Sequence, residues 1–359
     1  MVTLTSAETS TLRGQKLPRW ALPAIAVAAV TVAAGLFSIT GAQSIVGFVV
    51  TSGLFFAVGL TVVSFALEGP RQAKDRLATT AVYTAFVLAM APLASIAIYT
   101  VGRGMQRLDG DFLSRSMFLI SASSAGGGAY HAIIGSLLIT LITAALAVPL
   151  GVLTAIYLVE YGESKRLAKA VSFFVDVMTG VPSIVAGLFI YAFWILALGF
   201  QQSGLAGALS LVILMLPVVV RSTEEMLKLV PQELREASYA LGIPKWRTIA
   251  KVVLPTALGG IVTGVMLGIA RAMGETAPLL LLVGTQVRIN FDPFGFSHDT
   301  ANPISTLPTY IYSQLTSAAG STDSPSFDRA WAAALVLIII IMLLNLVARF
   351  AARFTKARG

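Results

Sequence analysis

The chain is dominated by apolar runs that are long enough to cross a lipid bilayer. A helix needs about 20 apolar residues to span the hydrocarbon core, which is about 30 Å thick. Only 12% of the 359 residues are charged, whereas a soluble globular domain carries roughly 25%. These features predict an all-α, polytopic membrane protein with about eight transmembrane helices. The predicted spans are approximately Trp20–Thr40, Ser44–Leu67, Leu77–Thr100, His131–Leu158, Val171–Leu198, Leu205–Val220, Pro255–Val283 and Arg329–Phe350.

The distribution of basic residues predicts how these spans are oriented. If the N-terminus is cytoplasmic, the inner loops and tails hold 19 Lys and Arg residues, and the outer loops hold 5. Basic residues are retained on the cytoplasmic side of a membrane, so we expect a multi-pass protein of the cell (inner) membrane with both termini in the cytoplasm. The first apolar run is longer than the 7–15 apolar residues typical of a signal peptide, which favours an uncleaved anchor.

Composition and motif content exclude several kinds of site. The chain has no cysteine, which rules out disulfides and thiolate ligands, and His131 and His298 lie far apart in the sequence, so no metal site is expected. The net charge of +8 is explained by orientation in a membrane, so we expect contact with membrane lipid and not with nucleic acid. The chain lacks the Gly-x-x-x-x-Gly-Lys-Ser/Thr loop that cradles nucleotide phosphates. We therefore expect it to bind no cofactor of its own.

The polar loops and the fifth span carry weaker signals. The longer outer loops, about 101–130 and 285–328, are expected to cap the bundle, and the Ser- and Gly-rich run 121–128 is predicted to be a flexible linker. Pro182 would kink or break the fifth span, either because the helix lines a pathway or because packing requires it. Asp176, in the same span, is interpreted either as a capping residue or as the partner of a neighbouring arginine.

A charged segment, residues 221–255, separates the sixth and seventh spans. At its start, Ser222 and Glu225 have the spacing of a capping box, which predicts a new helix. A second helix is expected to begin near Pro231 and to end at Gly242, because glycine readily adopts the left-handed conformation that closes a helix. The segment is thus predicted to fold as helix, tight turn and helix. One face of the second helix is expected to carry Leu234, Ala237, Ser238 and Leu241.

This segment resembles the EAA loop of ATP-binding-cassette importer permeases. The residues that match the family's pattern and spacing are Glu236, Ala237, Ser238, Gly242, Val252, Leu254 and Pro255, with Ser238 and Val252 in place of Ala and Ile. The resemblance implies a type I importer permease core whose short loop helix docks on a separate ATPase subunit, which binds ATP and Mg²⁺. The alternative is an amphipathic helix that lies on the membrane surface.

Two charged residues of the seventh span, Arg271 and Glu275, lie four residues apart and are expected on one helical face. An arginine at membrane depth costs at least about 2.5 kcal/mol, so it should face the bundle interior or a wet cavity. Arginine suits phosphate because its planar fork donates two hydrogen bonds to an oxyanion. The alternative for Arg271 is a structural ion pair with Glu275.

The stretch from about Tyr157 to Phe350 resembles the permeases of phosphate importers, and Gly274–Pro278 points to the PstA-type subunit among them. By this resemblance, residues matching Arg221, Glu224 and Arg271 take part in phosphate passage, although Arg221 could instead be an inner-leaflet anchor. The implied partners are a second permease subunit of PstC type, an ATPase dimer and an extracytoplasmic phosphate-binding protein.

The resemblance also predicts that the chain divides into two parts. Residues 1–75 would hold the N-terminus and two additional spans, and residues 76–359 would hold the permease domain with its coupling loop. The chain is then a transport subunit and not an enzyme. Two alternatives remain open: a permease for another oxyanion such as sulfate or molybdate, and an ion-coupled secondary anion transporter whose relay is Arg271, Glu275 and Asp176.

Overall fold

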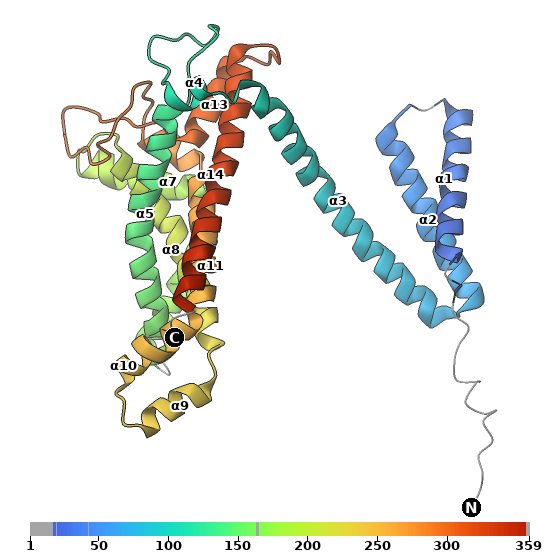
Figure 1. The fold of residues 1–359 in the computed structure, drawn as a ribbon, viewed down its shortest axis with the longest axis horizontal. Helices are drawn as coiled ribbons and strands as arrows, with labels where there is room; N and C mark the ends of the chain where they lie inside the picture. Colours follow the sequence, from blue (N-terminus) through green and yellow to red (C-terminus); the bar gives the residue numbers. More distant parts are fainter. Residues whose placement is uncertain (1–16, 19, 42, 163–164, 357–359) are drawn as a thin grey trace, which may run out of the picture. The chain divides into compact units, whose positions relative to one another are not determined.

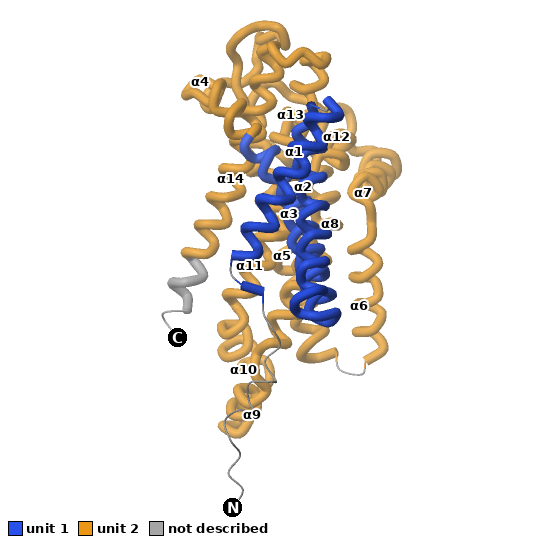
Figure 2. Tube along the Cα trace, turned by 90° about the vertical axis from the view of Figure 1, so that its right-hand side faces the viewer, with its two compact units in different colours: residues 1–98 blue, residues 99–359 orange. Residues whose placement is uncertain are grey.

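The chain, described by a computed structural model, is almost entirely helical in the part that the structure describes. It divides into two compact units, residues 1–98 and residues 99–359 (Figure 2). Among the residues that the structure describes, seven helices are long and apolar enough to cross a membrane, and a sharply bent pair of helices is an eighth candidate. The predicted all-α, polytopic fold is therefore confirmed. The residues outside the description are 1–16, 19, 42, 163–164 and 357–359.

Unit 1 is a helical hairpin followed by the first part of a third helix (Figure 1). The hairpin consists of α1 (Ala21–Thr40) and α2 (Ile45–Leu67), and α3 (Pro70–Arg107) follows. Gly41 takes a left-handed conformation with φ of 64° and ends α1, and the Ser44 side chain caps α2. Only 11% of the apolar window of each helix is buried, as expected of surfaces that face lipid.

A partly buried ion pair holds the end of α2 to the start of α3. Arg76 donates hydrogen bonds of 2.6 and 2.8 Å to the two carboxylate oxygens of Glu68, whose side chain is 1% exposed. The Ser64 hydroxyl and the Leu17 backbone N–H donate to the same carboxylate at 2.7 Å. These bonds, that of Arg76 foremost, lower the pKa of Glu68 to about 2. The carboxylate thus stays charged and fixes the turn between the two helices.

Unit 2 is a bundle built around the most buried of the candidate spans, α8 (Figures 1 and 2). Its long members are α5 (Tyr130–Ile156), α8 (Gly204–Lys228), α11 (Leu254–Met273) and α14 (Pro325–Lys356). In the apolar window of α8, 61% of the residues are buried, against 33% or less in the other candidate spans. Helix α8 is therefore the core element on which α5 and α11 pack.

Glycines allow the neighbouring helices to approach α8 closely. A Cβ atom at Gly151 of α5 would lie 2.7 Å from Cγ1 of Val219, and one at Gly264 of α11 would lie 2.3 Å from the hydroxyl of Ser222. Membrane helices pack through such small residues, because lipid provides no hydrophobic force that would drive them together.

The fifth predicted span is not a straight helix. It consists of α6 (Arg166–Thr179) and α7 (Ser183–Ile190), which continues as the π-helical segment η2 (Tyr191–Ala197). The two parts meet at a bend of 108°. Pro182 lies at the break, where it disfavours a helical conformation of the preceding residue and cannot donate a backbone hydrogen bond. The proline therefore breaks the span.

The seventh predicted span is also interrupted. Helix α11 ends at Met273, and a separate short helix, α12 (Ala277–Leu282), follows after three non-helical residues. Pro278 in the first turn of α12 prevents one helix from running through this point, because its ring would clash with the carbonyl of Gly274. The prediction of a continuous span over Pro255–Val283 is therefore wrong.

A fully buried arginine organises the end of the bundle that carries α4 (Gly110–Ser114) and α13 (Leu307–Ser317). Arg329 is 0% exposed, and its Nε donates to Oε1 of Gln314 at 2.8 Å. Its terminal nitrogens donate, at 2.7 to 3.1 Å, to the backbone carbonyls of Ala122, Ser124 and Gly126. Carbonyl dipoles thus neutralise a charge that is buried in the protein.

The run 121–128 is consequently not a flexible linker. Three of its carbonyls bind one guanidinium, and Gly126 and Gly127 have φ values of 98° and 69°, which side chains disfavour. The glycines that suggested flexibility serve to curve the loop around Arg329. Composition could not reveal this, because the ligand of the loop is about 200 residues away in the sequence.

Replacing Arg329 by Met should loosen this end of the bundle. The change leaves three carbonyls and the buried side chain of Gln314 without their donor, which should cost on the order of 3 kcal/mol. We expect a lower melting temperature of the detergent-purified protein and faster proteolysis within residues 115–128. The matched control is Arg115→Met, because Arg115 is exposed and forms an exposed ion pair worth about 1 kcal/mol or less. Equal stability of both variants would contradict the role of Arg329.

Candidate functional site

The loop between α8 and α11 is built from two short helices and a tight turn. Helices α9 (Gln232–Ala240) and α10 (Lys245–Thr248) are followed by the π-helical segment η3 (Ile249–Val253), which runs into α11. Between α9 and α10, Gly242 has φ of 73°, and its N–H donates to the carbonyl of Tyr239 at 2.9 Å. The predicted helix, turn and helix are confirmed, with glycine in the left-handed conformation that ends α9.

The beginning of the loop differs from the prediction. Helix α8 continues through Ser222 and Glu225 to Lys228 without a break. The Ser222 hydroxyl donates at 2.7 Å to the carbonyl of Val218 in the preceding turn. The capping box is therefore wrong, because a helix that is already running offers these residues no free N-terminal N–H groups to cap.

The side chains of α9 divide into a buried and an exposed set. Arg235 and Ser238 are buried, whereas Leu234 and Leu241 are 41% and 80% exposed. The face predicted to be apolar is therefore turned outward, apart from Ser238. The exposed residues of the loop include the motif residues Glu236 and Ala237 and the apolar residues Leu229, Leu234, Leu241 and Trp246. This mixed surface is free to contact another protein.

One hydrogen bond fixes α9 to the rest of the loop. The hydroxyls of Ser238 and Thr248 lie 2.8 Å apart and are both buried, so they join α9 to α10. This bond gives a physical reason for Ser where the motif has Ala. The last motif residues, Leu254 and Pro255, form the first turn of α11.

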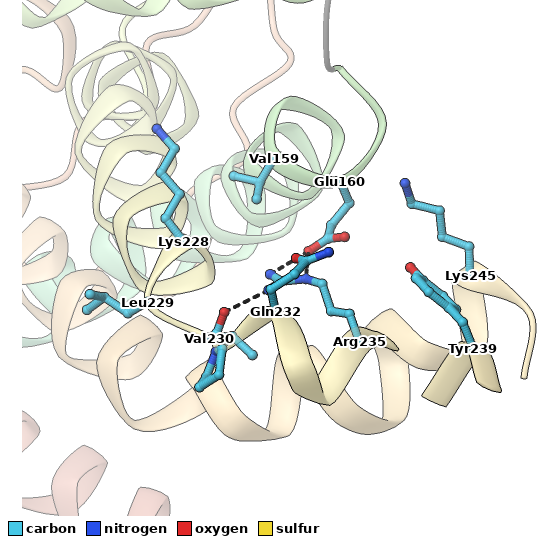
Figure 3. A pocket seen from close by; sticks show the side chains of 10 residues that line it. Val159, Glu160, Lys228, Leu229, Val230, Gln232, Arg235, Tyr239 and Lys245 are labelled. Carbon is cyan, nitrogen blue, oxygen red and sulfur yellow. Dashed lines mark hydrogen bonds and ion pairs between the residues drawn. The ribbon is translucent and has the colours of Figure 1, made fainter. Parts of the chain in front are cut away.

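A buried ion pair that the sequence did not single out ties α9 to the membrane helices (Figure 3). Nε and Nη2 of Arg235 donate to Oε1 of Glu160 at 3.1 and 2.9 Å. Glu160 belongs to the π-helical segment η1 (Tyr157–Tyr161), which continues α5. The guanidinium also donates to the carbonyls of Leu227 and Val230, at the end of α8 and just beyond it, at 3.0 and 2.7 Å. The partners are 75 residues apart, so the fold alone brings them together.

A second cluster joins α6 to α8 and contains two predicted site residues. Nη1 of Arg221 donates to Glu224 at 2.5 Å, and its Nη2 donates to Asp176 of α6 at 2.5 Å and to the Ser172 hydroxyl at 2.9 Å. Lys228 forms an ion pair with the other oxygen of Glu224 at 2.7 Å. Of the two interpretations of Asp176, that of an arginine partner is confirmed. Carboxylates thus occupy both terminal nitrogens of Arg221.

Arg271 has a more distant ion-pair partner than Arg221 has. Helix α11 ends at Met273, so Glu275 lies beyond the helix and not on its face as predicted. The Nε of Arg271 and Oε1 of Glu275 are 4.0 Å apart, and the Arg271 side chain is 50% exposed. Within the described part of the chain, its guanidinium donates no hydrogen bond. Arg271 therefore has N–H donors available for a ligand at the end of a membrane helix.

No group of three His, Asp or Glu side chains among the described residues is placed to hold a metal ion. The chemistry that these clusters offer is recognition of an anion by guanidinium groups. The loop in addition offers a small helix that is held firmly on one side and exposed on the other.

Residues 147–358 match the family described as the inner membrane component of binding-protein-dependent transport systems. A similar protein is the phosphate transport system permease protein PstA 1 of Mycobacterium tuberculosis (strain ATCC 25618 / H37Rv), which is 49% identical over 289 residues, covering 80% of this chain and 90% of the relative. The PstA protein of Yersinia pestis is 39% identical over 282 residues, covering 78% of this chain and 90% of the relative.

Among solved structures, a chain of a bacterial ABC transporter that imports the acidic polysaccharide alginate has a similar fold. The TM-score is 0.52 at 16% sequence identity, covering 79% of this chain and 99% of that chain. At this identity the likeness concerns the fold alone. The family match begins within α5 and extends over α8, α11, α14 and the loop between α8 and α11. This chain therefore belongs to the family of inner-membrane permease components of binding-protein-dependent transport systems.

Proposed function

We propose that this chain is the transmembrane permease subunit of an ATP-driven importer of inorganic phosphate. The observation that carries the proposal is the coupling loop, whose α9 is fixed to the bundle by Arg235 and exposes Glu236, Leu234 and Leu241. A rigid helix with an exposed face suits transmission of motion from a partner, because a flexible loop would absorb that motion. Phosphate as the substrate is supported by the names of the relatives, which are 49% and 39% identical.

The proposed complex contains several other chains. We expect a second permease subunit of PstC type beside this one, an ATPase dimer docked on α9, and an extracytoplasmic phosphate-binding protein. ATP and Mg²⁺ would be bound by the ATPase, and this chain would bind no cofactor. Docking of the ATPase puts α9 in the cytoplasm, which agrees with the excess of basic residues predicted for that side and with two cytoplasmic termini.

The domain division remains part of the proposal. The permease domain would begin near residue 76, and the two helices that precede it would be additional to the transport core. The compact units of the structure meet later, between Ile98 and Tyr99 within α3.

Two arginines are proposed to contact the anion one after the other during its passage. Arg271 has available N–H donors, and its ion-pair partner Glu275 is 4.0 Å away. An oxyanion can therefore bind Arg271 without displacing a strong ion pair. Arg221 is held by Asp176 and Glu224, so a phosphate can reach it after one of these carboxylates is displaced. Arg271 would therefore act first and Arg221 later in the passage.

Phosphate-stimulated ATP hydrolysis by the reconstituted complex tests the proposed function. The complex of this chain with its permease partner, ATPase and binding protein is placed in proteoliposomes, and hydrolysis is measured with phosphate, sulfate or molybdate. We expect stimulation by phosphate alone, together with phosphate uptake that requires the ATPase. Stimulation by sulfate or molybdate instead would identify another oxyanion as the substrate, and uptake in vesicles lacking the ATPase would identify a secondary transporter.

Substitutions at Gly242 test the coupling role of the loop. With φ of 73°, a β-branched residue is strained by about 1–2 kcal/mol, although no atom lies within 4 Å of its added Cβ. Gly242→Val should therefore distort the turn and abolish ATP-driven uptake while the protein still inserts. Gly242→Asn is the matched control, because Asn tolerates the left-handed conformation, and it should retain most of the uptake. Normal uptake by the Val variant would reject the coupling role.

A further inference from the structure

Arg235 is the point at which α9 is bonded to two membrane helices. Its guanidinium contacts Glu160 in the continuation of α5, the Leu227 carbonyl in the last turn of α8, and the carbonyl of Val230 just beyond α8. Figure 3 shows the side chain reaching from α9 toward Glu160. Helices α5 and α8 pack directly on each other in the bundle. Besides the backbone of residues 229–231, a displacement of α9 therefore acts through this side chain on the ends of two packed helices.

The bond is well suited to transmit force. Arg235 is 8% exposed and Glu160 is 6% exposed, so water does not compete strongly for either group. Charge-assisted hydrogen bonds from a planar guanidinium fix direction as well as distance. Cations are also favoured beside the free carbonyls at a helix C-terminus, where Leu227 lies. The guanidinium is thus held from three directions.

Among the described residues, the buried apolar cluster that contains Leu227 and Val230 includes no residue of α9. A cavity of about 450 Å³ lies beside the ion pair, and its lining includes Lys228, Gln232, Tyr239 and Lys245 as well as both members of the pair. The bond between Ser238 and Thr248 joins α9 to α10, within the loop itself. Across the cavity, the Arg235–Glu160 pair makes the connection from α9 to α5.

Two motif residues of α9 cannot make this connection. Glu236 and Ala237 are exposed, so they face outward and not toward the bundle. The residue before them, Arg235, faces inward. A π-helical segment such as the one that carries Glu160 is rare and frequently marks a functional site.

We propose that Arg235 and Glu160 are the positioning pair through which a movement of α9 is passed to α5 and α8. The inference rests on the proposed function, because it requires an ATPase that moves α9. The pair contacts neither nucleotide nor transported anion. Its role is to keep α9 and the membrane helices moving as one body. Loss of the pair should therefore separate ATP hydrolysis from transport.

The test replaces the pair by apolar residues of similar size in Glu160→Met/Arg235→Met. A buried ion pair exchanged for well-packed apolar residues commonly leaves stability unchanged or raised, and the adjoining cavity can supply water to the two released carbonyls. The control is Glu68→Met/Arg76→Met, which removes the partly buried ion pair of unit 1. Three quantities are measured in proteoliposomes: the amount of ATPase bound, ATP hydrolysed, and phosphate imported.

We expect the double variant to bind the ATPase as the wild type does and to hydrolyse ATP, but to use at least tenfold more ATP for each phosphate imported. The control variant should keep the wild-type ratio. A ratio within twofold of wild type in the assembled double variant would overturn the proposal.

A more conservative variant decides the matter if the double variant fails to assemble. Glu160→Gln keeps an acceptor oxygen for Arg235 and removes the charge, so folding should be preserved while the link is weakened. A rise of at least threefold in ATP used per phosphate supports the proposal, and an unchanged ratio overturns it. If the wild-type complex itself shows no phosphate-dependent hydrolysis, the proposed function fails, and this outcome is distinct from either result with the variants.

Discussion

A charged side chain inside a membrane protein must be neutralised, and this requirement organises the permease unit. Removing an ionised group from water costs far more than one apolar contact returns, so such groups are paired or hydrogen-bonded. Arg329 is neutralised by carbonyl dipoles, Arg221 by two carboxylates, and Arg235 by one carboxylate and two carbonyls. Each of these arginines thereby fixes backbone segments that are distant in the sequence.

The same requirement separates structural from functional arginines. A guanidinium whose N–H groups are all hydrogen-bonded has a structural role, and an anion can bind to it only after one of its hydrogen-bond partners has moved away. Arg271 differs, because its side chain is half exposed and its nearest carboxylate, Glu275, is 4.0 Å away. In the proposed mechanism, structural arginines such as Arg235 transmit the movement of α9 to the bundle, and Arg271 binds the anion. Transport and coupling then rest on different members of one class of side chain.

The sequence predicted the features that depend on local properties. Apolar length predicted the spans other than the bent fifth and the interrupted seventh. Gly242 predicted the turn that ends α9, because its left-handed conformation is a property of the single residue. Features that depend on distant partners were missed: the loop around Arg329, the Arg235–Glu160 pair, and the outward face of α9. The capping box at Ser222 failed for a related reason, because its pattern does not reveal that a helix is already present.

The central claim is that Arg271 is the first arginine to contact the transported anion, while Arg235 and Arg329 support the fold. The most direct measurement is ATP-driven phosphate uptake by the Arg271→Ala complex, with the amount of bound ATPase measured in the same vesicles. Loss of a charge-assisted bond to the anion should leave assembly intact and lower uptake at least about tenfold. Uptake within twofold of wild type, or collapse of the complex because the Arg271–Glu275 pair is structural, would contradict the claim.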